Sequence, residues 1–429
     1  MTKIIILSVF LCIVFSINAQ AQSLNDFIEL TINSHPAMQS QRNQMDVAQA
    51  DREVARQQFL PTPSVNVENK AWSNKSANSP TNNGDDTVLV LRLQQPLWTG
   101  GRLTAGLDKA DAQISVTAAA LLETRQQLAL RTIQAWGEWY GADLKVQAME
   151  RSLAEHQRLK EQVQRRVEAG ASGPNEQVLT DGRVDQTRSQ LEAYKGLLQM
   201  ARMKLALLTG RPLAREARPS QVLKFSPPGM ELVQDKVRAA SPSIQKLEAQ
   251  IKVQEAEVDE RKSDLMPEVF LRAEHQHGNA TYSNVPDSDA VFVGVSTKLG
   301  AGFSSLSRIE SSRKRLQAAN AEREATERAV LEQFQGDWVQ YHTLRARIPA
   351  LEASLTSTRL TAEAWDRQFL AGRKSWLEVM NTTRELAQAE IELADAKAAL
   401  VQTEWRLAVL SDGVDEVLRG NAQSASIRR

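Results

Sequence analysis

The sequence of 429 residues is poor in the residue types that build compact enzymes. It has one cysteine, 20 glycines and 14 prolines, and aromatic residues make up only 5%. Low glycine, proline and aromatic content is typical of long helices rather than of many short elements joined by loops. Lysine plus arginine and aspartate plus glutamate each count 52, so the formal net charge is zero. That balance argues against a dedicated nucleic-acid-binding protein, in which a large basic excess is usual.

The sequence also lacks the motifs of common catalytic and metal sites. It contains no HExxH, CxxC or GxSxG, and the segment Gly101–Gly106 is not followed by the Lys-Ser/Thr of a phosphate-binding loop. His275 and His277 share one face of a predicted strand, a spacing that suits a metal, but no third ligand is near them in sequence. We therefore interpret them as a surface pair. The sequence predicts no enzyme, no catalytic residue, no resident metal and no cofactor.

Long hydrophobic runs are missing after the first 21 residues, so no membrane-spanning helix is predicted there. Residues 4–15 form an apolar run of 12 residues, and Ala19-Gln-Ala21 fits a signal-peptide cleavage site. We predict that residues 1–21 are a signal peptide and that the mature chain begins at Gln22. Because Cys12 is removed with it, the mature chain would have no disulfide and no cysteine for lipidation.

The rest of the chain consists of two copies of one pattern. Pro36 and Pro242 stand in similar contexts 206 residues apart, and Trp136 and Trp338 stand 202 apart. The offset changes once, in an interval where a difference in loop length is expected. We predict an internal duplication, with a first repeat at residues 22–210, a linker at 211–230, a second repeat at 231–412 and a polar C-terminal tail at 413–429.

Each repeat contains a pair of predicted strands, and in the first repeat a helix predicted at residues 24–59 precedes them. Side chains that alternate along the sequence with a period of two residues predict strands at about 61–72 and 86–97, and at about 267–277 and 289–299. Four strands cannot close a barrel, and an open edge in lipid leaves backbone groups unpaired. Strands in a membrane would have to be pooled from several chains, whereas in water they would form a small sheet.

Long helices with a seven-residue repeat follow each strand pair. They are predicted at residues 102–169 and 304–370. Sustained heptads predict coiled-coil packing. In the first helix the series is Leu107, Ile114, Leu121, Leu128, Ala135, Ala142 and Met149. The segments Gly170-Ala-Ser-Gly173-Pro174 and Gly372-Arg-Lys-Ser375 are the predicted turns into the next helices.

This organisation resembles the TolC family of outer-membrane efflux and secretion channels over nearly all of the mature chain, from about Leu24 to Asp412. The repeat carries most of the resemblance, and Gln95-Pro-Leu-Trp-Thr-Gly-Gly101 resembles the family's strand-to-helix junction. The resemblance implies a mainly α fold with membrane β-strands. It also implies a homotrimer with a 12-strand β-barrel and a long periplasmic coiled-coil α-barrel, in the outer membrane of a Gram-negative bacterium and extending into the periplasm.

The resemblance further implies where the functional residues lie. Ser375-Trp-Leu-Glu378 resembles the family's turn at the periplasmic tip, where acidic residues line the aperture. The matching aperture residues are Glu378 and Asn381, with Glu176 in the first repeat, so an amide replaces one carboxylate. The residues expected at the adaptor-docking tips are Gly170, Gly173, Pro174, Gly372 and Ser375.

We expect a passive exit duct that is energised by an inner-membrane transporter and connected to it by a periplasmic adaptor. Many drug-efflux members of the family are lipidated at an N-terminal cysteine, which the mature chain would lack. This difference favours type I protein secretion here, with an ABC transporter and possible cargo such as a large adhesin. The alternatives are the outer-membrane component of a small-molecule efflux pump or, from another class, a periplasmic coiled-coil adaptor or structural protein. An adaptor would have one hairpin flanked by β-rich halves. Outer-membrane lipid is an expected partner and nucleic acid is not.

Overall fold

The computed structural model describes residues 22–69, 87–213, 219–220, 227, 229–278, 287–297 and 300–426. The predicted signal peptide, the outer ends of some predicted strands and much of the predicted linker lie outside the described residues. The elements are β1 (Gln22–Ser23), α1 (Leu24–Ser34), α2 (Pro36–Gln57), β2 (Thr62–Asn69), β3 (Thr87–Trp98), α3 (Arg102–Glu168), α4 (Pro174–Thr209), β4 (Pro219–Ser220), α5 (Met230–Ala240), α6 (Pro242–Ser263), β5 (Glu268–His277), β6 (Asp287–Ser296), η1 (Ala301–Phe303), α7 (Ser304–Leu370) and α8 (Trp376–Ser426).

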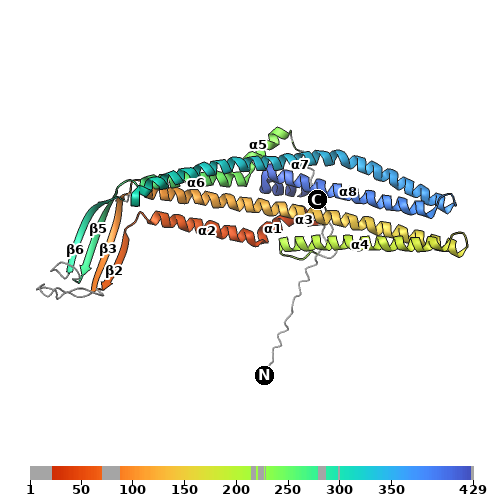
Figure 1. The fold of residues 1–429 in the computed structure, drawn as a ribbon, viewed down its shortest axis with the longest axis horizontal. Helices are drawn as coiled ribbons and strands as arrows, with labels where there is room; N and C mark the ends of the chain where they lie inside the picture. The colour runs from red at the N-terminus through yellow and green to blue at the C-terminus, as the bar shows by residue number, and fades with distance from the viewer. Residues whose placement is uncertain are drawn as a thin grey trace, which may run out of the picture. The chain divides into compact units, whose positions relative to one another are not determined.

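Apart from η1, which has no counterpart in the first repeat, the two repeats contain the same elements in the same order (Figure 1). α1 and α5 have 11 residues each, α2 and α6 have 22 each, and α3 and α7 have 67 each. In each repeat the strand pair lies between the 22-residue helix and the 67-residue helix. The duplication inferred from the sequence is therefore present element by element in the fold.

A proline divides the helical segment at the start of each repeat. His35 has extended backbone angles, φ −72° and ψ 130°, and Ser241 has φ −66° and ψ 114°. The residue before a proline is disfavoured in the helical region, whereas the proline itself suits the first helical position. The single helix predicted at residues 24–59 was therefore wrong, because Pro36 ends α1 and begins α2.

The chain forms two compact units, and each combines segments of both repeats. The strand unit, as we call it, contains Pro36–Gln126 and Gln234–Gln333. The turn unit contains Met1–His35, Gln127–Val233 and Phe334–Arg429. Neither repeat is a unit of its own, because α3 and α7 each contribute residues to both units.

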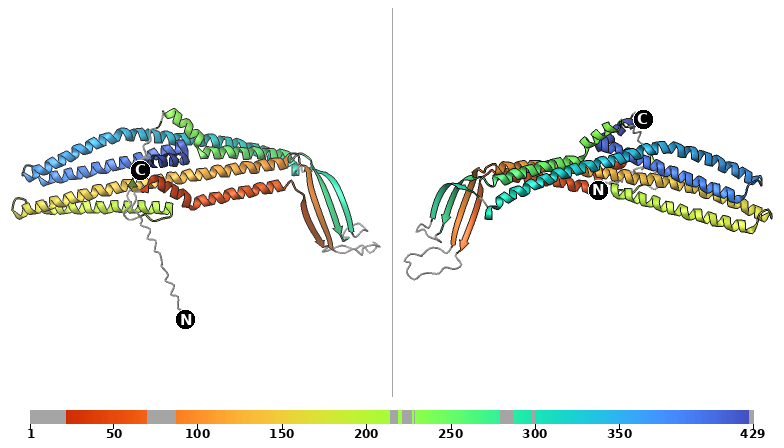
Figure 2. Two further views of the ribbon diagram at one scale, coloured as in Figure 1. Left: turned by 180° about the vertical axis from the view of Figure 1, so that it is seen from behind. Right: turned by 45° about the horizontal axis from the view of Figure 1, so that its top comes forward.

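The strand unit contains a four-stranded antiparallel sheet in the order β2-β3-β5-β6 (Figures 1 and 2). Each repeat supplies one hairpin, and the hairpins join through β3 and β5, from the pair Leu89–His277 to the pair Trp98–Val269. A register shift between Pro96 and Trp98 interrupts this ladder. Within the described residues, β2 and β6 each pair with one strand only, so both outer edges of the sheet are open.

Aromatic residues fill the core of the turn unit. Trp136 and Trp139 of α3 are fully buried and contact each other edge to face, with ring centroids 6.5 Å apart. Phe27 of α1 packs on Trp139 with its ring centroid at 5.8 Å. Phe334 and Tyr341 of α7, which stand 202 residues after Thr132 and Trp139 of α3, are also fully buried. Aromatic side chains of both repeats are thus buried in this core, although Trp338, the equivalent of Trp136, is only partly buried.

Two glycines let α3 and α8 approach closely. A Cβ atom added to Gly137 would lie 2.2 Å from the side chain of Gln402, and one added to Gly141 would lie 3.0 Å from the Cβ atom of Ala398. Gln402 also donates a hydrogen bond from Nε2 to the carbonyl oxygen of Gln134, at 3.2 Å. Small residues at these positions therefore set the distance between helices of different repeats.

Charged side chains are buried where α7 packs on α8. Asp337 is 6% exposed, and its Oδ2 accepts hydrogen bonds from Arg406 Nε at 3.2 Å and Nη2 at 3.0 Å. Burial raises the pKa of Glu404 to about 7, against the opposing effect of Arg345. Removing one member of a buried ion pair leaves the other charge uncompensated, so this pairing holds α7 and α8 in one register.

The C-terminal segment is helical, not the polar tail predicted from the sequence. α8 continues to Ser426, with one non-helical residue, Gly413, at φ 79°. Val414, Val417 and Leu418 are buried, and Asn25 Nδ2 donates to the carbonyl oxygen of Leu418 at 3.2 Å. The polar composition concealed an apolar stripe with helical spacing, which packs on the start of the chain.

Replacing Gly141 by valine should destabilise the protein, because the larger side chain must displace Ala398 and separate α3 from α8. The expected loss is about 1–3 kcal/mol. Gly196→Ala in α4 is the matched control, since no atom lies within 4 Å of the added Cβ, and a higher helix propensity should keep or raise its stability. The measurement is the midpoint of thermal unfolding in detergent, and equal midpoints for both variants would contradict the close approach.

Candidate functional site

Both helical turns have the same backbone geometry. Gly170 has φ +68° and Gly372 has φ +72°. The N–H of Ala171 bonds to the carbonyl oxygen of Arg166 at 2.8 Å, and that of Arg373 bonds to Gln368 at 2.8 Å. Helices commonly end at a glycine with positive φ, followed by a backbone hydrogen bond that spans five residues. Glycine adopts this conformation without strain because it has no Cβ atom. The two predicted turns are therefore equivalent in conformation, 202 residues apart.

The helices that follow the turns begin differently. α4 begins with Gly173 as N-cap and Pro174 at the first position, with no side-chain bond to the cap. At the second turn, Ser375 Oγ accepts from the N–H of Glu378 at 3.3 Å, while the N–H of Ser375 donates to Glu378 Oε2 at 3.0 Å. This reciprocal capping box satisfies backbone donors that would otherwise lack partners. The second turn is stabilised by side chains and the first by its proline.

Glu378 is committed to this second turn. Lys374 Nζ donates to Glu378 Oε1 at 2.6 Å and lies 4.3 Å from the ring centroid of Trp365. The bond from Lys374, followed by the bonds from Ser375, lowers the pKa of Glu378 to about 2. The carboxylate that the sequence placed at an acidic aperture is thus ionised, but an ammonium group of its own turn neutralises it.

The other two predicted aperture residues lie in different surroundings. Glu176 is in the first turn of α4, where a negative charge favours the helix N-terminus, and its carbonyl oxygen accepts from Thr180 Oγ1 at 2.7 Å. Asn381 lines a cavity of about 120 Å³ with His156, Arg183 and Arg384, between α3, α4 and α8. Burial lowers the pKa of His156. Asn381 therefore faces a junction of three helices whose named ionisable groups are basic.

An apolar cluster that sequence reasoning missed packs the second turn against α3. It comprises Leu159, Val163, Phe369, Trp376, Val379 and Met380. Arg166 of α3 reinforces the contact, because its Nη1 donates to the carbonyl oxygen of Phe369 at 3.4 Å and its guanidinium lies 5.1 Å from the Phe369 ring centroid. Phe369 lies seven residues after Ala362 in α7, a heptad spacing that does not show which residues of another helix it contacts.

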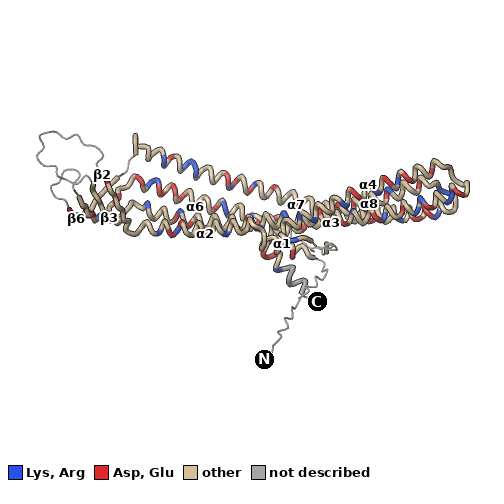
Figure 3. Tube along the Cα trace, turned by 90° about the horizontal axis from the view of Figure 1, so that it is seen from below, with Lys and Arg blue, Asp and Glu red and all other residues tan. Residues whose placement is uncertain are grey.

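A charged groove of about 800 Å³ lies beside this cluster, between α3, α7 and α8. Glu390 is held between Arg151, at 2.9 Å, and Arg359, at 3.1 Å. Arg158 contacts Asp366 at 2.8 Å. Acidic and basic residues alternate along these helices (Figure 3). These charged residues of the groove are thus paired with one another.

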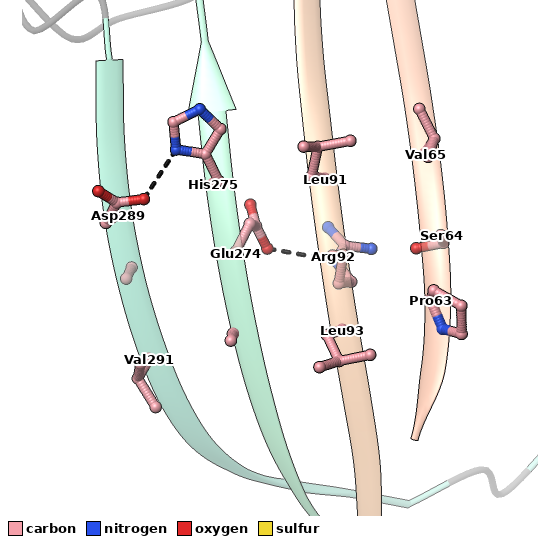
Figure 4. A pocket seen from close by; sticks show the side chains of 12 residues that line it. Pro63, Ser64, Val65, Leu91, Arg92, Leu93, Glu274, His275, Asp289 and Val291 are labelled. Atoms are coloured by element: carbon pink, nitrogen blue, oxygen red, sulfur yellow. Dashed lines mark hydrogen bonds and ion pairs between the residues drawn. The ribbon is translucent and has the colours of Figure 1, made fainter. Parts of the chain in front are cut away.

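The sheet of the strand unit has two chemically different faces. One face carries exposed apolar side chains: Val65, Val67, Leu91, Leu93, Leu271, Val291, Val293 and Val295. The opposite face carries charged groups, and there Glu274 Oε2 accepts a hydrogen bond from Arg92 Nε at 3.2 Å (Figure 4). The same oxygen lies 3.4 Å from Arg272 Nε in an ion pair. An apolar face toward lipid and a polar face toward water is the pattern of strands in an outer-membrane protein.

Among the described residues, no helix has both the length and the apolar character required to cross a bilayer.

The sequence matches the family described as outer membrane efflux protein over residues 27–211 and 233–412. The chain belongs to this family. It is 24% identical over 419 residues to the alkaline protease secretion protein AprF of Pseudomonas aeruginosa, covering 93% of this chain and 86% of AprF.

Solved structures of outer-membrane channels have the same fold. The outer-membrane channel OprN is similar with a TM-score of 0.80 and 19% identity, over 91% of this chain and 89% of OprN. CusC is similar with a TM-score of 0.77 and 17% identity, over 90% of this chain and 91% of CusC. VceC from Vibrio cholerae is similar with a TM-score of 0.76 and 16% identity, over 91% and 96%.

These findings confirm the resemblance to the TolC family and the predicted fold class. The protein is an outer-membrane channel protein that extends into the periplasm, and its family consists of passive channels rather than enzymes. Family members form trimers and work with a periplasmic adaptor and an inner-membrane transporter.

Removing the capping box should weaken the second turn and leave the first unchanged. Ser375→Ala should lower the free energy of unfolding by about 1 kcal/mol. Glu378→Gln should cost less in the Ser375→Ala variant than in the wild type, because the two side chains form one reciprocal cap. Glu176→Gln, at the equivalent position, is the control. Thermal unfolding of the wild type, the two single variants and the double variant measures the coupling, and strictly additive effects would contradict a reciprocal cap.

The same interaction predicts a pH dependence. The pKa of Glu378 is about 2 in the folded protein, against an ordinary value of 4.5. Its stabilising effect is therefore complete above pH 4.5 and disappears as the pH falls through about 2. The stability difference between the wild type and Glu378→Gln should be constant near neutral pH and shrink in acid. A difference that grows with acidification would refute the assignment.

Proposed function

We propose that this chain is the outer-membrane exit duct of a type I protein secretion system, working with a periplasmic adaptor and an inner-membrane ABC transporter. The observation that carries the proposal is the similarity to AprF, named for the secretion of an alkaline protease, along 93% of the chain. The position of Cys12 within the predicted signal peptide also supports it, because the mature chain would then lack a cysteine for lipidation. The proposed cargo is a secreted protein, for instance a large adhesin.

We propose further that the duct is a homotrimer. The sheet has two open edges, at β2 and β6, and an exposed apolar face. An open edge in lipid leaves backbone N–H and C=O groups without hydrogen bonds, at several kcal/mol each. Pairing β6 of one chain with β2 of the next removes these edges, and three chains would form a closed barrel of about 12 strands.

We propose the helical turns as the docking surface for the adaptor. The two turns differ in the apolar surface that they offer. After the first turn, the neighbouring Val178 and Leu179 are 69% and 58% exposed. At the second turn, Leu370 and Leu377 are 63% and 43% exposed, whereas Val379 and Met380 are buried. A partner helix docks through apolar side chains set in a groove. The first turn, with Gly170, Gly173 and Pro174, is therefore proposed as the main contact, and the second, with Gly372 and Ser375, as a supporting one.

Deleting the gene in its host separates secretion from efflux. We expect one or more proteins to disappear from the culture medium, because the duct would be their only exit, while inhibitory concentrations of antibiotics and dyes stay unchanged. Complementation with the wild-type gene should restore the secreted proteins. An unchanged set of secreted proteins together with increased drug susceptibility would instead identify small-molecule efflux.

Replacing both turn glycines by valine tests the docking assignment. At positive φ a residue with a Cβ is strained by about 1–2 kcal/mol, and no other atom lies within 4 Å of the added Cβ atom of either Gly170 or Gly372. The double variant should reach the outer membrane as a trimer but support less export. The control is Gly182→Val in α4, which also has open space around the added Cβ atom. Normal export by the double variant, or failure to form trimers, would refute the assignment.

A further inference from the structure

Two histidines and two aspartates form a matched set at one end of the β5–β6 hairpin. The register pairs His275 with Asp289 and His277 with Asp287 across the two strands. His275 Nδ1 lies 2.7 Å from Asp289 Oδ1, and His277 Nδ1 lies 2.5 Å from Asp287 Oδ1. Figure 4 shows the first of these pairs, with the imidazole directed toward the carboxylate of the neighbouring strand.

All four side chains lie on the apolar face of the sheet, at its end. Side chains two residues apart share a face of a strand, so His275 and His277 continue the row of Leu271 and Ala273. On β6, Asp287 and Asp289 lie in one row with Val291 and Val293 and precede them in the sequence. The apolar face thus ends in a polar group of four. Two histidines in a row are not needed to end an apolar band, because any polar residue would do so.

The hydrogen bonds select the state in which each imidazole can bind a metal. An ionised carboxylate only accepts, so Nδ1 is the donor in each pair, and in the neutral imidazole the lone pair is then on Nε2. Metal-binding histidines usually have such a carboxylate on the other nitrogen, which fixes the ring and raises its basicity. The His275 and His277 side chains are 45% and 64% exposed, so a metal in solution can reach them.

The spacing suits a shared ion. Residues i and i+2 of a strand have Cα atoms about 6.7 Å apart on one face. Two imidazoles at that separation can converge on an ion with metal–nitrogen distances of about 2.0–2.1 Å. In the described part of the chain, no group of three or more His, Cys, Asp or Glu side chains is arranged to hold a metal. A site on these two histidines would supply two protein ligands and leave the other positions to water.

We propose that Nε2 of His275 and Nε2 of His277 bind a divalent transition metal ion, of the class Cu²⁺, Ni²⁺ or Zn²⁺, with Asp289 and Asp287 as positioning residues. Imidazole ligands favour these metals over Ca²⁺ and Mg²⁺, which prefer oxygen. The ion would tie two positions of β5 together at the end of the apolar face. This site is independent of the cargo of the duct and of its partners.

Titration of the purified full-length protein, made without a histidine tag, tests the proposal. Calorimetry with Zn²⁺ should give one ion per chain, and electron paramagnetic resonance with Cu²⁺ should show coupling to two nitrogens. His275→Gln and His277→Gln should each abolish the two-nitrogen signal. Asp289→Asn and Asp287→Asn should keep two nitrogens but weaken Zn²⁺ binding by about 10–100-fold. His342→Gln, an exposed histidine of α7, should change neither measurement.

Some results would overturn the proposal. If the Cu²⁺ signal has fewer than two nitrogens, or survives both His275→Gln and His277→Gln, the histidines are not the ligands. If Asp289→Asn or Asp287→Asn removes nitrogen coupling as fully as the histidine variants do, the carboxylates do not merely position the rings. Because all four side chains are exposed at the end of a hairpin, these substitutions should not unfold the protein, and circular dichroism verifies this.

Discussion

The pairing of β3 with β5 is the interaction on which the sheet depends. It joins hairpins from two repeats through a ladder from Leu89–His277 to Trp98–Val269. Without it, each repeat would have an isolated two-stranded hairpin, which is at best marginally stable in water. With it, the chain has one sheet with an apolar face, a charged face and two open edges. The repeats are joined within a chain because backbone N–H and C=O groups need hydrogen-bond partners. The same need at the open edges of β2 and β6 is the reason for pairing with neighbouring chains.

The helices meet the complementary requirement, that long amphipathic surfaces be covered. Heptad positions Leu128, Ala135, Ala142 and Met149 of α3 are all buried, as are Ala387, Ala394, Val401 and Ala408 of α8. Alanines at half or more of these positions bring the helices close together, and Gly137 and Gly141 reduce the separation further. Such close packing leaves little room for larger residues. The buried pair of Asp337 and Arg406 then adds a polar contact that fixes the register of α7 on α8.

Duplication left two turns of equal backbone geometry and different side-chain chemistry. The left-handed glycine is kept in both, since only glycine adopts that conformation without strain. The caps have diverged, so that Ser375, Glu378 and Lys374 stabilise the second turn, whereas Pro174 begins the helix after the first. The second turn is also packed on α3 through Phe369 and Trp376. The first leaves Val178 and Leu179 exposed.

Local patterns in the sequence determined the repeat, the strands, the heptad helices and the glycine turns, because periodicity and glycine conformation are properties of neighbouring residues. Local reasoning failed where distant residues meet. Residues 413–429 were predicted to be a polar tail, although Val414, Val417 and Leu418 form a buried stripe that packs on the start of the chain. Only the tertiary structure decided that His275 and His277 each face an aspartate, since cross-strand register depends on how two strands align and not on the spacing within either.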